Sequence, residues 1–256
     1  MEIDQDRFDR QKRVTGWDQE KIARSRCLVV GAGALGNEVV KNLAQFGVGE
    51  LTIVDYDEIV AANLNRCVFF EKKDAEEKRL KAEVLAERVE KINPEIKIEI
   101  ETKRIEYLPE SFYGKFDCAF GCLDNLGARL HLNANCYGRM PLIDGGTTGF
   151  MGKVQVVNAP SSCLECGMSR QDYGLLWKKY SCVGDVLDFL DPKMPALPTT
   201  TGIVAAIQTN EFAKMAHGGE LAKESLAGKY LFFNGLKNEA TVFEVPKRKE
   251  CPVRLD

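Results

Sequence analysis

The sequence predicts an α/β protein built on a doubly wound, mostly parallel sheet, with antiparallel strands added toward its C-terminal end. Three observations predict this fold. Short apolar runs alternate with amphipathic stretches through the first half of the chain, the first run ends in a glycine-rich turn, and the regular alternation stops beyond Gly145. Strands that alternate with helices are parallel, and helices cover both faces of their sheet.

The first strand–helix–strand unit is the most clearly marked. Residues 27–30 form an apolar run that predicts a buried strand, and the turn GAGALG follows at residues 31–36. An amphipathic helix then extends to Phe46. Residues 51–54 predict the second strand, which ends at Asp55.

The later elements follow from the same patterns. Apolar side chains recur every three or four positions over residues 75–93, which predicts a helix ending before Pro94. Residues 96–100 alternate apolar and polar side chains, as in a half-buried strand. We expect further strands at 116–121, 140–144, 152–157, 230–234 and 240–245, and further helices at 125–137 and 199–216.

Residues 161–198 have no strong period. A connection of this length is too long to be idle, so we interpret it as a functional loop or small helical insert that crosses over within one domain spanning residues 1–256. This crossover segment carries a cysteine, Cys182.

Composition excludes several classes of protein. The 35 basic and 38 acidic side chains give a net charge of −3, so neither nucleic acid nor an anionic membrane is an expected partner. Residues 1–13 are charged throughout, unlike a signal peptide. Nine cysteines in a chain without such a signal indicate reduced thiols, a metal site or a catalytic thiol rather than disulfides. We therefore expect a cytoplasmic protein.

The turn Gly31-x-Gly33-x-x-Gly36 predicts a nucleotide site in a Rossmann-like fold. Glycines there bring backbone N–H groups, such as that of Ala34, close to a phosphate at a helix N-terminus, and Asp55 can hold ribose hydroxyls. The alternative is a tight turn with a packing glycine. Taken alone, this motif would most often indicate a dinucleotide dehydrogenase.

The residues that follow favour a triphosphate over a nicotinamide cofactor. Arg66 and Lys81 supply two cations, although both could be ordinary surface charges. Asp124 and Asn125 come directly after a predicted strand, at the edge where such sheets bind ligands. A carboxylate at that edge could hold Mg²⁺, or Asp124 could simply cap the following helix.

Seven motifs occur in one order along the chain, and together they are specific. As a set they resemble the ubiquitin-activating enzyme superfamily, which includes the adenylyltransferases of sulfur-carrier proteins. The segment PLIDGGTTGFMGK at residues 141–153 is more similar to the branch that activates ubiquitin-like modifiers. The seven are Arg7-Phe-Asp-Arg10-Gln, GAGALG, Asp55-x-Asp57, Asn63-Leu-x-Arg66, Arg79-x-Lys81-Ala-Glu, Asp124-Asn125 and Cys163-x-x-Cys166.

The resemblance implies a single adenylation domain that uses ATP and Mg²⁺. An acyl-adenylate forms when a carboxylate attacks the α-phosphorus, a step that needs charge neutralisation and alignment rather than a protein base. The chain has only two histidines, as such a site permits. The implied contacts are Gly33, Ala34, Asp55, Asp57 and Asn125 with the nucleotide, Asn63, Arg66 and Lys81 with its phosphates, Asp124 with Mg²⁺, and Arg10 with the partner's site in a homodimer.

The resemblance also implies a structural zinc site at Cys163, Cys166 and Cys251. The family pattern is two CxxC pairs, whereas Arg254 stands here where the fourth ligand should be. The site could have lost its metal, or an oxygen or another cysteine could complete it. The three cysteines could also be small buried apolar residues.

Cys182 occupies the place of the thioester-forming cysteine in the modifier-activating branch. Lys178 and Lys179 lie close in sequence and would favour its thiolate, which is the nucleophile. Some relatives that serve sulfur carriers have a cysteine here without an obligatory role. Cysteines on predicted core elements, such as Cys27 and Cys118, are better explained by packing.

The sequence therefore predicts an enzyme that adenylates the C-terminal carboxylate of a ubiquitin-like modifier and then forms a thioester on Cys182. A carrier (conjugating) protein would receive the acyl group. One alternative is an adenylyltransferase for a sulfur-carrier protein, which shares the first step only. A second is a non-catalytic scaffold subunit of a heterodimeric activating enzyme, and a third is an NAD-dependent dehydrogenase.

Overall fold

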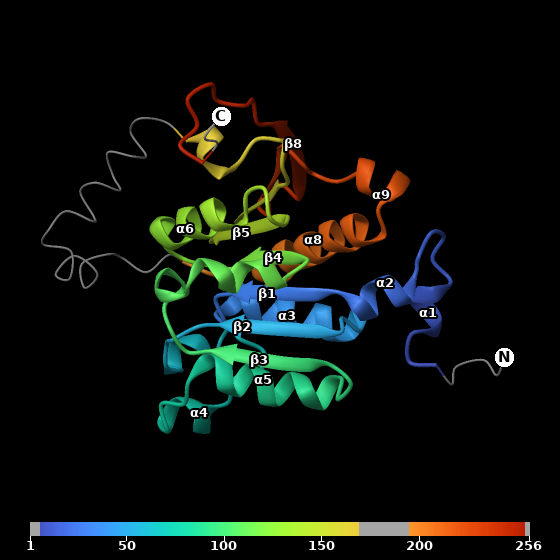
Figure 1. Cartoon of the computed structure of the whole chain (residues 1–256). Helices are drawn as coiled ribbons and strands as arrows, with labels where there is room; N and C mark the ends of the chain where they lie inside the picture. Colours follow the sequence, from blue (N-terminus) through green and yellow to red (C-terminus); the bar gives the residue numbers. More distant parts are fainter. Residues whose placement is uncertain (1–5, 169–194, 254–256) are drawn as a thin grey trace, which may run out of the picture.

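The computed structural model describes residues 6–168 and 195–253, which form one mixed sheet of eight strands (Figure 1). Five strands are parallel: β3 (Lys97–Glu101), β2 (Glu50–Val54), β1 (Arg26–Val30), β4 (Cys118–Gly121) and β5 (Leu142–Thr148), in that order across the sheet. Antiparallel strands complete the sheet in the order β6 (Met151–Val157), β7 (Lys229–Asn234) and β8 (Glu239–Glu244). The predicted fold class is confirmed.

Helices cover both faces of the sheet, as predicted. On one face α3 (Ala34–Phe46), α5 (Lys81–Ile92) and α8 (Pro198–His217) enclose the larger apolar core, in which Phe120 packs against Phe212. On the other face, α6 (Leu126–Cys136) encloses the second core. The shorter helical elements are α1 (Asp9–Lys12), α2 (Gln19–Arg24), η1 (Ala61–Asn63), α4 (Lys72–Glu76), η2 (Ile105–Tyr107), η3 (Glu110–Lys115), η4 (Leu164–Gly167) and α9 (Gly219–Lys223).

The helix predicted over residues 75–93 is wrong at its start. The structure divides this region into α4 and α5, because Lys78 takes a positive φ of 52° that no helix continues through. Helix α5 therefore begins at Lys81, beside the ends of the parallel strands. The recurring apolar positions are Ala82, Leu85, Val89 and Ile92, which all lie after the break, so their spacing could not reveal it.

The strand predicted to end at residue 144 is longer in the structure. Strand β5 continues to Thr148 and forms a tight hairpin with β6, in which Thr148 is opposite Met151. Gly152 permits a close approach of α8, since a Cβ there would lie 2.4 Å from the Val204 side chain. The hairpin thereby extends the sheet past the ends of its parallel strands.

Of the predicted crossover segment, residues 169–194 lie outside the described residues, and with them Cys182. Within the described parts of the chain, no helix is both long enough and apolar enough to cross a membrane.

Candidate functional site

An open pocket of about 250 Å³ lies at the carboxyl ends of the parallel strands. Its walls come from the segments that follow β1, β2, β3 and β4, and from β5 itself. All nine residues that the sequence predicted to contact a nucleotide line it: Gly33, Ala34, Asp55, Asp57, Asn63, Arg66, Lys81, Asp124 and Asn125. Residues separated by up to 92 positions (125 − 33) thus share one cavity.

The glycine turn at the end of β1 brings backbone close to backbone. Gly31 has a φ of +99°, and a Cβ on it would lie 2.4 Å from the Cys122 carbonyl oxygen. A Cβ on Gly36 would lie 1.9 Å from the Gly31 carbonyl oxygen, so no other residue fits there. A Cβ on Gly33 would instead meet nothing within 4 Å.

Gly33 is also the N-cap of α3, where no side chain caps the helix and no acidic residue lies in the first turn. The first N–H groups of this 13-residue helix are thus open toward the pocket and carry the positive end of the helix dipole. This arrangement suits a phosphate group.

Asp55 is fixed by two backbone hydrogen bonds at the end of β2. Its Oδ2 accepts from the Ala32 N–H at 2.6 Å, and its Oδ1 accepts from the Asp57 N–H at 2.8 Å. Burial raises the pKa of Asp55, while the charge of Lys81 and these two N–H groups oppose the rise. The carboxylate is therefore held rigidly beside the glycine turn, with lone pairs available to accept from hydroxyl groups.

Lys81, the first residue of α5, turns its amine into the pocket, where Nζ lies 2.6 Å from Asp57 Oδ2. Burial lowers the pKa of Lys81, but attraction to Asp55 and Asp57 outweighs it, and the net effect is a raised pKa. Lys81 is accordingly a charged ammonium group at neutral pH, held between the acidic groups Asp55 and Asp57.

Asn63 and Arg66 come from the turn around η1. The Asn63 Oδ1 accepts from the Val60 N–H at 3.0 Å, which fixes the side chain and leaves its NH₂ group to donate. The Arg66 guanidinium bonds to the Ala62 carbonyl and, at 2.9 Å, to Asn65 Oδ1. Both residues line the pocket, where their N–H groups can donate to a ligand.

Asn125, and not Asp124, caps the helix that follows strand β4. Asn125 is the N-cap of α6, and its side chain accepts from the Ala128 N–H at 2.8 Å. Asp124, one residue earlier, is exposed in the pocket wall and is not the cap. Its carboxylate is consequently available to a hard cation.

Arg10 is not among the described residues that line this pocket. It lies in α1, which Figure 1 shows beyond the amino ends of the parallel strands, at the opposite end from the pocket. The Arg10 side chain is 73% exposed. Within one chain it does not reach the pocket, and any role there would require a second copy.

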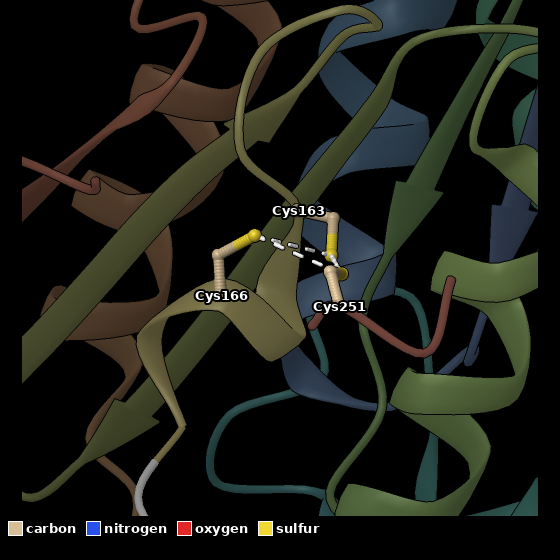
Figure 2. A group of neighbouring side chains, drawn as sticks. All are labelled: Cys163, Cys166 and Cys251. Atoms are coloured by element: carbon tan, nitrogen blue, oxygen red, sulfur yellow. Dashed lines mark hydrogen bonds between the residues drawn. The ribbon is translucent and has the colours of Figure 1, made fainter. Parts of the chain in front are cut away.

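The three predicted metal ligands meet in one cluster (Figure 2). The Cys163 and Cys251 sulfurs are 3.3 Å apart, and that of Cys166 lies 3.8 Å from each. Cys163 is the N-cap of η4, Cys166 lies within η4, and Cys251 comes from the C-terminal segment. Thiols so placed are a suitable donor set for zinc, although small buried apolar residues would also pack this way.

Sequence reasoning missed several residues of the pocket wall. Gly145, Gly146 and Thr147 of β5 line it, because the strand is longer than predicted. Behind Gly146, the Arg129 guanidinium forms a bidentate ion pair with buried Asp144. A further missed residue, Arg104, lies 5.5 Å from the centre of the Tyr56 ring. The sequence signal that could have found Gly145 and Arg104 is their position shortly after a predicted strand.

Comparison with known families and proteins gives one consistent match. The model of the ThiF family matches residues 8–253. Ubiquitin-like modifier-activating enzyme 1 of Oryctolagus cuniculus is 37% identical over 165 residues, which are 60% of this chain and 15% of that protein. SUMO-activating enzyme subunit 2 of Dictyostelium discoideum is 37% identical over 152 residues, 57% of this chain and 22% of that protein. The chain thus spans less than a quarter of the length of these relatives.

Two solved structures share the fold. A crystal structure of E. coli MccB with ATP superposes with a TM-score of 0.73 at 20% identity, covering 92% of this chain and 68% of that one. A crystal structure of PaaA gives a TM-score of 0.69 at 19% identity, covering 89% and 75%. At these identities the likeness supports the fold alone.

Proposed function

Because the chain belongs to the ThiF family, we propose that it is an ATP-dependent adenylating enzyme that activates the C-terminal carboxylate of a ubiquitin-like modifier. The observation that carries this proposal is the convergence of nine predicted nucleotide contacts on one pocket. The similarity to ubiquitin- and SUMO-activating proteins supports the choice of substrate class.

The pocket residues fit a triphosphate nucleotide. In this proposal Asp55 accepts from the ribose hydroxyls, and the open N-terminus of α3 at Gly33 and Ala34 faces the phosphates. Asn63 donates its NH₂ group to them, while Arg66 and Lys81 neutralise their charge. Asp124 would hold Mg²⁺, which would supply further neutralisation of the phosphate charge. A dinucleotide dehydrogenase has no need of these cations.

The chemistry follows from charge and alignment. The modifier's carboxylate oxygen attacks the α-phosphorus, the P–O bond to the β-phosphate breaks, and pyrophosphate leaves with the electron pair. Negative charge develops on the leaving group, where Lys81 and Arg66 are placed to stabilise it. No proton transfer is needed, which agrees with a pocket wall that contains no histidine among its described residues.

A protein substrate has a suitable surface beside the pocket. Lys153 of β6 is opposite Gly146 of the pocket wall, and next across the sheet Phe232 is opposite Lys153. On the same face Tyr230 stacks on Phe243, with ring centres 5.0 Å apart. Phe232 and Phe243 are 36% and 42% exposed. We propose that the folded body of the modifier docks on this apolar face and sends its C-terminal tail past Lys153 into the pocket.

The thioester step belongs to this proposal as a separate claim. Cys182 would attack the acyl-adenylate carbonyl, AMP would leave, and the thioester would then pass to the thiol of a carrier protein. A sulfur-carrier adenylyltransferase would perform only the adenylation. In a heterodimer, as the resemblance to a SUMO-activating subunit suggests, another chain would supply part of the machinery.

Two further elements complete the proposal. Arg10 acts in the pocket of a second copy, which makes the active form a homodimer. Zinc, when bound, is held by Cys163, Cys166 and Cys251 and ties the C-terminal segment to η4. These roles are supported by the remote place of Arg10 and by the sulfur–sulfur distances.

The test is ATP–pyrophosphate exchange with a panel of ubiquitin-like and sulfur-carrier proteins, followed by non-reducing gels. We expect exchange that depends on one protein partner, and a thiol-sensitive adduct that Cys182→Ala abolishes. Exchange without the adduct would contradict the thioester step and favour an adenylyltransferase for a sulfur-carrier protein. A chain that binds ATP but exchanges with no partner would contradict the proposal and favour the scaffold alternative.

A further inference from the structure

The cysteine cluster has three ligands where a closed structural zinc site has four. Among the described residues, no other His, Cys, Asp or Glu places a ligand atom within 4.8 Å of all three sulfurs. Glu165, which lies between the first two cysteines in sequence, is not part of the group. In the sequence, the position three residues after Cys251 is Arg254, whose guanidinium is no ligand for zinc.

The spacing of the sulfurs nevertheless fits a tetrahedral ion. Zn–S bonds of about 2.3 Å place two sulfur ligands about 3.8 Å apart in a tetrahedron. Cys166 lies at this distance from each of the other two sulfurs. Only Cys163 and Cys251, at 3.3 Å, would need to separate slightly. Three corners of a tetrahedron are thus nearly in place.

The surroundings favour thiolates, the form that binds zinc. Asn133 of α6 is completely buried, and its Oδ1 accepts from the Leu164 N–H at 3.1 Å. This bond turns the amide toward the cluster, where its Nδ2 has no conventional acceptor among the described residues. The same amide group interacts with the Cys163 thiol. An N–H donor beside a sulfur stabilises the charged ligand and is typical of a metal site's outer shell.

The cluster is also accessible from one side. Cys163 and Cys251 are 0% and 4% exposed, whereas Cys166 is partly exposed. Figure 2 shows Cys166 on the turn of η4, facing Cys163 and Cys251. A small ligand can therefore approach the metal position from the Cys166 side.

We propose that this cluster binds zinc through three thiolates and leaves the fourth coordination position to an exchangeable ligand, a water molecule or a small nitrogen or sulfur donor. This inference rests on the zinc part of the proposed function and is independent of the adenylation chemistry. Binding releases three thiol protons, and no electrons are transferred. Three thiolates and Zn²⁺ give the site a net charge of −1, with water as the neutral fourth ligand.

Cobalt substitution of the full-length protein tests the inference without reference to activity. The metal is removed with a chelator under a phosphine reductant, Co²⁺ is titrated in, and imidazole is then added. We expect one Co²⁺ per chain, sulfur-to-cobalt charge-transfer absorption that falls by about a third in Cys251→Ser, and visible bands that shift saturably with imidazole. The fall by a third reflects three equivalent thiolates.

Bands that imidazole does not move would overturn the inference, because the chain itself would then supply the fourth ligand. Failure to bind either Co²⁺ or Zn²⁺, in protein whose circular dichroism shows it folded, would overturn both the inference and the zinc proposal. Neither result would bear on the adenylation proposal, which pyrophosphate exchange tests separately. The matched control is Cys136→Ala, which removes a buried thiol from the same apolar core and should leave the cobalt spectrum unchanged.

Discussion

Lys81 and Asp57 are 24 residues apart in sequence, and their side chains form an ion pair of 2.6 Å inside the pocket at the carboxyl ends of the strands. Asp55 is a second carboxylate near the same amine, and its charge also attracts the Lys81 ammonium group. A bound phosphate would replace Asp57 as the nearest anion to Lys81. The ion pair therefore keeps the Lys81 ammonium group in the pocket before ATP binds.

Substitution of Lys81 tests this role. We expect Lys81→Gln to reduce pyrophosphate exchange by about 100-fold or more, since it removes a charged donor from the pocket. Circular dichroism should stay native, because the glutamine side chain, although shorter than lysine, is polar and keeps most of the packing. Lys91→Gln, on the exposed last turn of the same helix, is the control and should retain exchange. Equal losses in both variants would show that Lys81 has no special role.

The glycine turn provides a matched pair of variants. Gly36→Ala forces a Cβ against the Gly31 carbonyl and should destabilise the fold by about 3 kcal/mol or more in urea unfolding. Gly33→Ala meets nothing within 4 Å and should leave stability nearly unchanged. Its methyl group would instead narrow the pocket, so ATP affinity should fall. Comparable stability losses in both variants would contradict this assignment.

The buried carboxyl of Asp55 predicts a pH dependence. Its pKa in the folded protein is raised above the ordinary 3.8, so the folded state binds this proton more tightly than the unfolded state. Stability from this group is present below the ordinary value and is lost as pH rises through the raised one. Urea unfolding at a series of pH values should show this decline in the wild type, and Asp55→Asn should lack it. The prediction would be contradicted if, between the ordinary and the raised pKa, the unfolding free energy of the wild type rose more steeply with pH than that of Asp55→Asn.

Substitution of Asn133 should weaken the affinity of the cysteine cluster for zinc. Asn133→Asp retains an acceptor for the Leu164 N–H but loses the donor toward Cys163 and adds a negative charge. Loss of such an outer-shell partner typically weakens metal binding by about 10- to 100-fold. Competition with a chelator of known affinity measures the change. The partly exposed Asn135 on the same helix offers Asn135→Asp as a control for the added charge.

The remote place of Arg10 predicts complementation between two inactive variants. If Arg10 acts in the pocket of the partner, Arg10→Ala and Lys81→Gln should each lose most exchange activity. A mixture that exchanges subunits should regain up to about a quarter of wild-type activity, because half of the dimers are mixed and each of those has one intact site. No recovery in mixed dimers isolated with two different affinity tags would contradict the homodimer proposal.

The sequence predicted the pocket well because its residues follow strand ends. In a parallel sheet those ends share one edge, so Asp55, Asp124 and the turn at Gly33 had to converge. The capping role of Asn125 rather than Asp124 could not be chosen, since both residue types cap helices. The pocket wall at Gly146 was missed because the length of the β5–β6 hairpin depends on pairing between strands.

Long-range packing could not be predicted from sequence patterns. The place of α1 depends on Phe8, which fills the space where a Cβ on Gly47 would stand. The meeting of Cys163 with Cys251 spans 88 residues and was expected only from the family resemblance. The break between α4 and α5 depends on one residue, Lys78, whose type gives no warning of a positive φ.

The central claim is that a partner's carboxylate attacks the α-phosphorus of ATP in this pocket. Once exchange identifies the partner, its C-terminal carboxylate can be labelled with ¹⁸O and the released AMP analysed by mass spectrometry after hydroxylamine cleavage of the acyl-adenylate. We predict one ¹⁸O atom in the AMP, because the attacking carboxylate oxygen remains on phosphorus. AMP without the label would contradict the account.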